Sequence, residues 1–151
     1  MINSQNNVNE FLHQKKIAVV GVSRNKSKFG NMIYRELKSR GYQVMAVNPN
    51  ADMVEGDRCY AGLGALPEKP DGVILVVPSK QGVEIVEETA RLGIRYIWIQ
   101  QGAESPEIEK RCCELDLVAV SGECIFIFLE PVKSIHGFHR FFKKLFGKMP
   151  K

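Results

Sequence analysis

Several features that mark other classes of protein are missing from this sequence of 151 residues. No segment approaches the roughly 20 consecutive apolar residues that a membrane span needs. The asparagine-rich start, residues 1–10, lacks the basic residues and apolar run of a secretory signal. The cysteines have neither the C-x-x-C spacing of a zinc site nor the density of a disulfide framework. We therefore expect a cytoplasmic protein with reduced thiols and no membrane span.

Acidic residues are missing from the C-terminal stretch, residues 132–151, which carries six basic residues. The rest of the chain has 15 basic against 17 acidic residues, so we expect no nucleic acid partner. Phenylalanines alternate with cations in this stretch at near-helical spacing. This pattern predicts a basic amphipathic C-terminal helix that packs on its own domain, on a second copy or on a partner subunit; a membrane surface is the alternative.

The length and the 44% hydrophobic content fit one compact domain, which we assign to residues 1–131. Apolar, β-branched runs alternate there with amphipathic stretches. This alternation predicts a Rossmann-like three-layer α/β sandwich, in which helices cover both faces of a five-stranded, mainly parallel sheet. The five predicted strands are residues 17–22, 42–47, 71–77, 94–99 and 117–120.

Helix starts are predicted from capping residues. Asn7 is expected to cap a first helix, Ser79 a helix that runs to about residue 92, and Ser105, followed by proline, a third. Another helix is predicted over residues 31–40. The segment 50–70 is rich in glycine and proline, so we predict only a short helical turn in it and place it near the ligand.

The turn after the first strand is the most informative part of the sequence. A Gly-x-Ser turn, Gly21 to Ser23, interrupts the apolar run, and an amphipathic helix follows. Glycine lets the backbone approach an anion, and free N–H groups at a helix start can hold it. Because Arg24, Lys26 and Lys28 add three cations, we predict a ligand that is rich in phosphate.

Two features argue against a dinucleotide in this turn. Six residues separate Ser23 from Gly30, whereas a G-x-G-x-x-G turn fits a pyrophosphate closely. The second strand ends in Asn48-Pro49, where an NAD site usually has an acidic residue for the ribose; Asp52 lies past the proline. An NAD(P)-dependent oxidoreductase, or another nucleotide-dependent enzyme subunit, therefore remains the alternative rather than the first choice.

Four motifs at predicted strand ends resemble the small stand-alone CoA-binding domain proteins. They are also similar to the N-terminal CoA-binding domain of the succinyl-CoA synthetase α subunit, and the resemblance spans residues 15–124. The motifs are Val20-Gly21-Val22-Ser23 with Lys28-Phe29-Gly30, Ala46-Val47-Asn48-Pro49, Val76-Val77-Pro78-Ser79 and Trp98-Ile99-Gln100-Gln101-Gly102.

The resemblance implies coenzyme A as the cofactor. It implies that four loop residues hold the CoA phosphates, and that the other motifs flank the nucleotide and the pantetheine arm. The phosphate-binding set is Gly21, Ser23, Lys28 and Gly30, to which the charge pattern adds Arg24; the flanking set is Asn48, Pro49, Val77, Pro78, Gln100 and Gly102.

The chain departs from the family pattern at two places. The synthetase has a lysine just past the proline of its second strand, where this chain has Asn50 and Ala51. The stand-alone proteins often have Asp-Arg-Cys after the fifth strand, where this chain reads Gly122-Glu123-Cys124. A cation is therefore missing at each of these points.

No catalytic residue or metal ligand is predicted. The synthetase uses a phosphorylated histidine from a second domain, and the histidines here, His13, His136 and His139, form no recognisable set. Trp98 is predicted either in the core or as a wall of the site, and Cys124 is predicted as a structural thiol. We expect a protein that binds CoA or an acyl-CoA and catalyses no reaction on its own.

Overall fold

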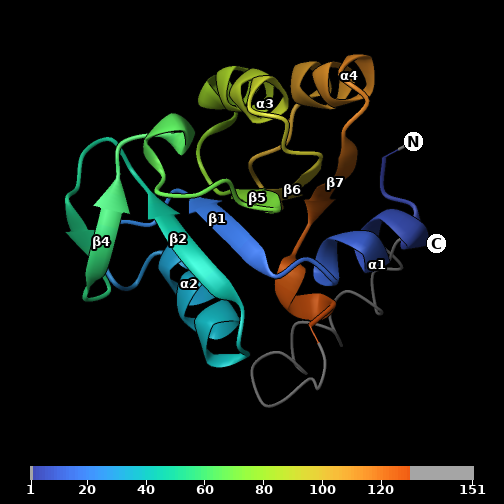
Figure 1. The fold of residues 1–151 in the computed structure, drawn as a ribbon. Coiled ribbons are helices and arrows are strands. Elements are labelled where there is room, and N and C mark those ends of the chain that lie inside the picture. Colours follow the sequence, from blue (N-terminus) through green and yellow to red (C-terminus); the bar gives the residue numbers. More distant parts are fainter. Residues whose placement is uncertain (1, 130–151) are drawn as a thin grey trace.

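The computed structural model describes residues 2–129 (Figure 1). The strands are β1 Lys16–Val20, β2 Gln43–Val47, β3 Met53–Val54, β4 Asp57–Tyr60, β5 Gly72–Leu75, β6 Tyr96–Gln100 and β7 Val118–Glu123. The helices are α1 Gln5–Leu12, α2 Phe29–Ser39, α3 Gly82–Arg91 and α4 Pro106–Glu114, with 3₁₀ turns η1 Leu63–Ala65, η2 Ser79–Gln81 and η3 Ile125–Ile127. The helix predicted in the C-terminal stretch and the domain boundary at residue 131 lie outside the described residues.

The strands form one sheet in the order β3-β4-β2-β1-β5-β6-β7. All neighbours run parallel except β3 and β4, which are antiparallel. Figure 1 shows α3 and α4 on one face of the sheet and α1 and α2 on the other. The Rossmann-like three-layer fold predicted from the sequence is therefore confirmed.

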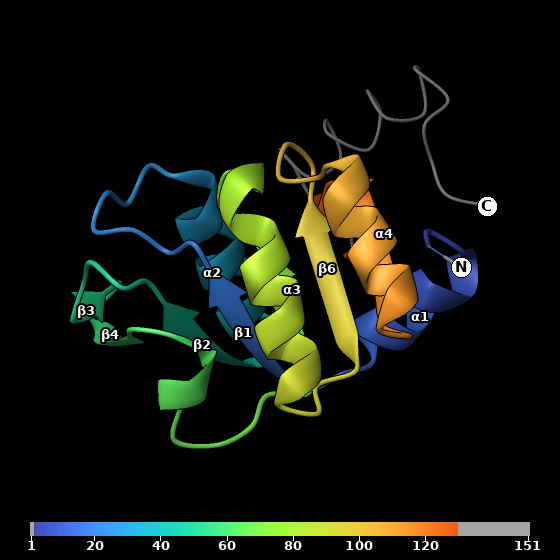
Figure 2. The same cartoon turned by 90° about the horizontal axis from the view of Figure 1, so that it is seen from above.

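The predicted number of five strands is wrong, because the sheet has seven. The two additional strands, β3 and β4, lie within the segment that was expected to be irregular, and Figure 2 shows them beyond β2, at one end of the sheet. A two-residue turn joins them, with Glu55 at φ 52° and Gly56 at φ 77°. Two central residues with positive φ are typical of a tight hairpin turn, whose twist matches that of the strands.

The alternation of side chains along the strands divides the core into two halves. On the side of α1 and α2, Val19 and Ile74 pack with Phe11. On the side of α3 and α4, Leu75 packs with Ile108. Both halves are closed to solvent, as a parallel sheet with two covered faces requires.

Trp98 belongs to the core, which decides between its two predicted positions. Its side chain is fully buried, makes an edge contact with Phe11 and packs in a tilted arrangement against Phe128. The indole N–H donates to the Glu123 backbone oxygen over 2.9 Å. Trp98 is therefore a structural residue that ties β6 to the end of β7.

Two of the predicted helix caps are wrong. Ser4, not Asn7, caps α1: its hydroxyl accepts the Asn7 backbone N–H over 3.0 Å. Ser79 begins the turn η2 instead, and α3 starts at Gly82 without a side-chain cap. Ser105 caps α4 as predicted and accepts the Ile108 N–H. Within residues 2–129, no helix has the length and apolarity needed to cross a bilayer.

Candidate functional site

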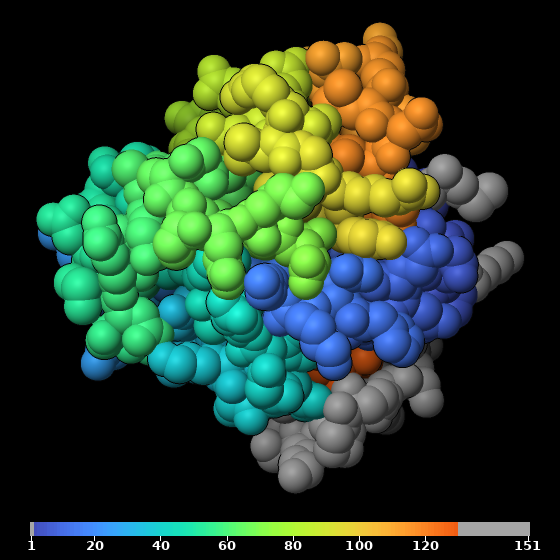
Figure 3. All heavy atoms as spheres, in the orientation of Figure 1, coloured from blue at the N-terminus to red at the C-terminus, as the bar shows by residue number. Residues whose placement is uncertain are grey.

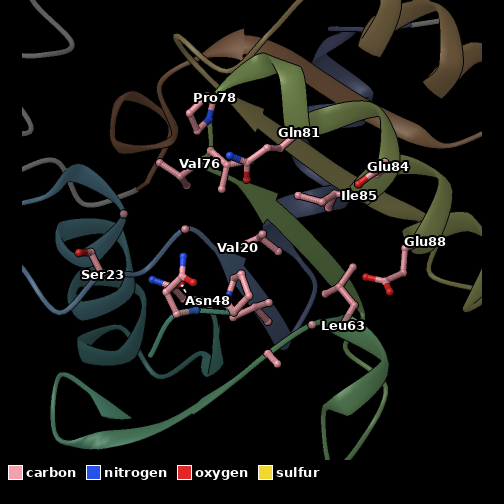
Figure 4. A pocket seen from close by; sticks show the side chains of 18 of the residues that line it. Val20, Ser23, Asn48, Leu63, Val76, Pro78, Gln81, Glu84, Ile85 and Glu88 are labelled. Atoms are coloured by element: carbon pink, nitrogen blue, oxygen red, sulfur yellow. Dashed lines mark hydrogen bonds between the residues drawn. The ribbon is translucent and has the colours of Figure 1, made fainter. Parts of the chain in front are cut away.

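A cavity of about 570 Å³ opens at the carboxyl ends of β1, β2 and β5 (Figure 4). The chain leaves β1 toward β2 on one side and reaches β5 on the other, so the cavity lies where the strand order reverses. Ligands of open parallel sheets bind at this kind of place, in cavities of this size. Eight of the predicted site residues line it: Gly21, Ser23, Lys28, Gly30, Asn48, Pro49, Val77 and Pro78.

Three predicted site residues do not line the cavity. Arg24 lies in the exposed part of the loop after β1. Gln100 is buried, and its side-chain oxygen accepts the Ile125 N–H over 3.2 Å. Gly102 has a φ of +98°, and its N–H donates to Glu104 over 2.6 Å. The cavity ends at β5, one strand before β6, whose last residue is Gln100 and which is followed by the turn that contains Gly102.

The start of α2 faces the cavity without a cap of its own. Lys28 is the N-cap residue, makes no side-chain capping bond and is followed by no acidic residue in the first turn. Lys28, Phe29 and Gly30 all line the cavity. The first N–H groups of a helix have no partner within it and carry the positive end of its dipole, so this arrangement favours an anion.

Two glycines of the loop permit close backbone packing. A Cβ on Gly21 would lie 2.5 Å from the Val76 carbonyl oxygen, and its φ of +121° also favours glycine. A Cβ on Gly30 would overlap the Gly21 carbonyl oxygen. These glycines bring β1, α2 and the end of β5 together, which sets the shape of the cavity.

Asn48 connects the loops after β1 and β2. Its amide nitrogen donates to the Val22 carbonyl over 2.9 Å, and its side-chain oxygen accepts the Asn50 N–H over 2.8 Å. Its own backbone N–H bonds to Tyr60. The Asn-Pro motif therefore has a visible structural function, because it holds two cavity loops at a fixed separation.

Asn31 is a site residue that the sequence analysis missed. It is completely buried, its side-chain oxygen accepts the Ser23 N–H over 2.8 Å, and its amide nitrogen donates to the Ser23 carbonyl over 2.6 Å. Both backbone groups of Ser23 are thereby fixed by one side chain. An amide in the first turn of an otherwise amphipathic helix, just after a Gly-x-Ser turn, was the available signal.

The wall of the cavity opposite the loop differs from the loop in the charge and polarity of its side chains. Leu63 from η1 and Ile85 from α3 are apolar, whereas Glu84 and Glu88, also on α3, are acidic. In Figure 4 the Glu88 carboxylate points from α3 toward Leu63. The space-filling view in Figure 3 shows the segment from β4 to β5, in green, between the two helical layers, and η1 in this segment contacts α3. The cavity is therefore cationic at the loop and acidic at α3.

The cysteines among the described residues offer no activated thiol at the cavity. Burial raises the pKa of the Cys59 thiol, and it raises that of Cys112 to about 12. Cys124 is buried and does not line the cavity. In residues 2–129, no three His, Cys, Asp or Glu side chains are grouped as a metal site would need. His136 and His139 lie outside this part of the chain.

The reversal of strand order and the cavity beside it define a Rossmann-like α/β domain that can take a ligand at the carboxyl ends of its strands. Comparison with known families makes this more specific. Residues 15–130 match the family described as CoA binding domain, and the chain belongs to this family.

The relatives include both ligases and small proteins. The chain is 32% identical over 114 residues to acetate–CoA ligase (ADP-forming) II of Archaeoglobus fulgidus; the match covers 70% of this chain and 17% of the ligase. It is 27% identical to the uncharacterized protein YneT of Bacillus subtilis, over 81% of this chain and 91% of YneT. The chain thus spans about a sixth of the length of that ligase.

A solved structure also resembles this chain in its fold. A conserved hypothetical protein from Pyrococcus furiosus superposes with a TM-score of 0.72 at 39% identity, over 76% of this chain and 99% of that chain. A protein of similar size therefore shares the fold of most of this chain, and the sequence match relates a part of the ligase to the same domain.

Proposed function

We propose that the protein binds coenzyme A, or an acyl-CoA, in the cavity at the ends of β1, β2 and β5, and that it catalyses no reaction on its own. The observation that carries the proposal is the uncapped start of α2, which faces the cavity beside Lys28 in a chain of the CoA-binding domain family. CoA carries a pyrophosphate and a 3′-phosphate, and backbone N–H groups with a lysine are suited to such anions.

The proposed contacts follow from position in the cavity. The Gly-x-Ser loop and the helix start would hold phosphate oxygens through Gly21, Ser23, Lys28 and Gly30, with Arg24 contributing charge from the exposed part of the loop. The apolar edges of Pro49, Val77 and Pro78 would lie along the ligand, and Asn48 would hold the loop. Gln100 and Gly102, which lie outside the cavity, are not proposed as contacts.

The proposed setting is the cytoplasm, where CoA and the free thiols of this chain would be compatible. A second copy or a partner subunit, contacted through residues 132–151, is also proposed. The relatives named as ligases support a partner, because this chain matches only a small part of such proteins.

The deciding experiment is calorimetric titration of the nucleotide-stripped protein with CoA, then with NAD and NADP, at one fixed salt concentration. We expect CoA to bind with a micromolar Kd and both dinucleotides to give no heat. Binding of a dinucleotide without CoA would overturn the proposal in favour of an oxidoreductase. Incubation with acetyl-CoA is expected to release no CoA thiol above the buffer rate.

Replacement of one lysine tests whether the loop after β1 binds the phosphates of the ligand. Lys28→Ala is expected to weaken CoA binding about 10- to 150-fold, because a charged hydrogen bond to phosphate contributes on the order of 1.5–3 kcal/mol. Lys110→Ala, on α4, removes the same charge away from the cavity and should leave the Kd unchanged. A greater loss for CoA than for dephospho-CoA would place Lys28 at the 3′-phosphate, and equal losses would place it at the pyrophosphate.

A further inference from the structure

The β3–β4 hairpin carries a carboxylate that reaches under the loop after β1. Glu55 occupies the first turn position of the hairpin, and its side chain is only 8% exposed. It does not line the cavity. An acidic residue that is buried this far requires hydrogen-bond partners, and those it has belong to the phosphate-binding region.

Two side chains of α2 converge on one oxygen of this carboxylate. Asn31 Nδ2 donates to Glu55 Oε2 over 2.7 Å, and Arg35 Nη1 donates to the same atom over 2.9 Å. Arg35 Nη1 also donates to the carbonyl oxygen of Lys26 over 3.0 Å. Glu55 thus orients the two side chains of α2 that bond to the loop backbone.

The loop depends on these bonds at two places. Asn31 bonds to both backbone groups of Ser23, and Arg35 bonds to Lys26, three residues further along the loop. Among the described residues, the intervening Asn25 bonds to loop neighbours, namely Ser23, Ser27 and Lys28. Among the hydrogen bonds of the described residues, those of Asn31 and Arg35 therefore connect the middle of this loop to the rest of the domain.

We infer that Glu55 is a positioning residue: through Asn31 and Arg35 it holds the loop from Ser23 to Lys28 in the shape that receives the ligand phosphates. The inference rests on the proposed function only for the identity of the ligand. A loop that is ordered before binding loses less entropy when the ligand arrives, so the effect of Glu55 should appear in affinity. A carboxylate is suited to this place because it accepts from both an amide and a guanidinium.

The other carboxylate of the hairpin provides a matched control. Asp57 accepts from the Tyr34 hydroxyl over 2.8 Å and from Lys38 Nζ over 2.6 Å, both on α2. It therefore fastens the same hairpin to the same helix but touches no residue of the loop through these bonds. A merely structural role of Glu55 would make Glu55 and Asp57 variants behave alike.

The experiment compares Glu55→Ala, Glu55→Gln and Asp57→Asn by amide hydrogen exchange of residues 23–28 in the ligand-free protein, by the Kd for CoA and by thermal unfolding. Glu55→Ala is expected to speed exchange in the loop and raise the Kd about tenfold, the size expected when a buried donor loses its partner. Glu55→Gln, whose amide oxygen can still accept, should recover part of both effects. Asp57→Asn should lower the melting temperature without changing loop exchange or Kd.

Unchanged exchange in residues 23–28 of both Glu55 variants, or the same change in Asp57→Asn, would overturn the inference. Glu55→Gln retains shape and one acceptor, so it keeps the test decisive if Glu55→Ala does not fold. If the unaltered protein does not bind CoA, the proposed function fails, whereas loop exchange still decides whether Glu55 positions the loop.

Discussion

Gly30 shows how strongly one residue without a side chain can constrain the site. It is buried at the start of α2, against the carbonyl oxygen of Gly21. Its backbone is not in the left-handed region, so glycine is required here because a larger side chain would clash sterically, not because of the backbone conformation. A side chain there would push the helix start away from β1, and the N–H groups that face the cavity would move with it.

We predict that Gly30→Ala destabilises the fold by about 1–3 kcal/mol, the usual cost of overpacking, and also weakens CoA binding. Gly64→Ala is the control, because a Cβ at Gly64 meets no atom within 4 Å. Urea unfolding measures the free energy and calorimetry the Kd. Unfolding curves of Gly30→Ala and Gly64→Ala that coincide would contradict the steric argument.

The sequence predicted the loop residues that lie next to the first strand, and it missed the residues that hold them. Gly21 and Ser23 stand directly after an apolar run, so their place at a strand end follows from local pattern. Asn31 and Glu55 function through contacts across 8 and 24 residues of sequence. Such contacts depend on the tertiary fold, and no spacing rule in a single sequence encodes them.

At the scale of elements, the long buried strands were predictable and the hairpin was not. Apolar runs that contain several β-branched residues identify β1, β5 and β6. In contrast, β3 has two residues and β4 has four with mixed polarity. The turn sequence Glu55-Gly56 has glycine at its second position but lacks the asparagine or aspartate that usually signals a tight hairpin. Likewise, Ser79 resembles a cap but is followed by a 3₁₀ turn.

The hairpin is fastened by carboxylates whose pKa values lie below the ordinary range. For Asp57, the hydrogen bond from Lys38 is the main cause, followed by that from Tyr34. For Glu55, burial alone would raise the pKa, but the hydrogen bonds from Asn31 and Arg35 outweigh burial and lower it. Each carboxylate therefore stabilises the folded state in its charged form.

A depressed pKa in the folded state gives stability that is present above the unfolded pKa and lost as the pH falls through the folded value. We predict that the free energy of unfolding is constant near neutral pH and falls below about pH 4, the ordinary range of carboxyl groups. The double variant Glu55→Gln/Asp57→Asn should lose less stability between about pH 6 and pH 3. Urea unfolding across this pH range measures the free energy of unfolding of both proteins.

The control for this pH series is Glu107→Gln, an exposed carboxylate on α4, across the sheet from the hairpin's contacts with α2. It should retain the pH dependence of the unaltered protein. Identical slopes for the double variant and the unaltered protein would show that the hairpin carboxylates do not carry the acid sensitivity.

At the scale of the whole molecule, the position of the charges matters more than the net charge. Outside residues 132–151 the chain has a slight acidic excess, so a polyanionic ligand gains little from the overall field. Attraction must come from the loop after β1, and the acidic wall on α3 opposes it at the other end of the cavity. For the proposed ligand, this polarity predicts an orientation with the phosphates at the loop and the uncharged parts toward Glu84 and Glu88.

This polarity predicts that removing an acidic charge from α3 strengthens CoA binding. Glu88→Gln should lower the Kd about twofold at low salt, because a unit charge about 10 Å away in water contributes on the order of 0.4 kcal/mol. The gain should shrink at high salt, where the field is screened. Among the described residues, the Glu88 carboxylate pairs with Arg91 at a distance of 3.9 Å on a partly exposed helix face, so the fold should tolerate the change.

Glu107→Gln again serves as the control, because it removes the same charge from a residue that does not line the cavity. An equal gain in both variants would mean that net charge alone governs affinity. A gain in Glu88→Gln that persists at high salt would mean that Glu88 meets the ligand directly rather than through its field. Only a salt-sensitive gain confined to Glu88→Gln supports a cavity that orients its ligand by opposite charge at its two ends.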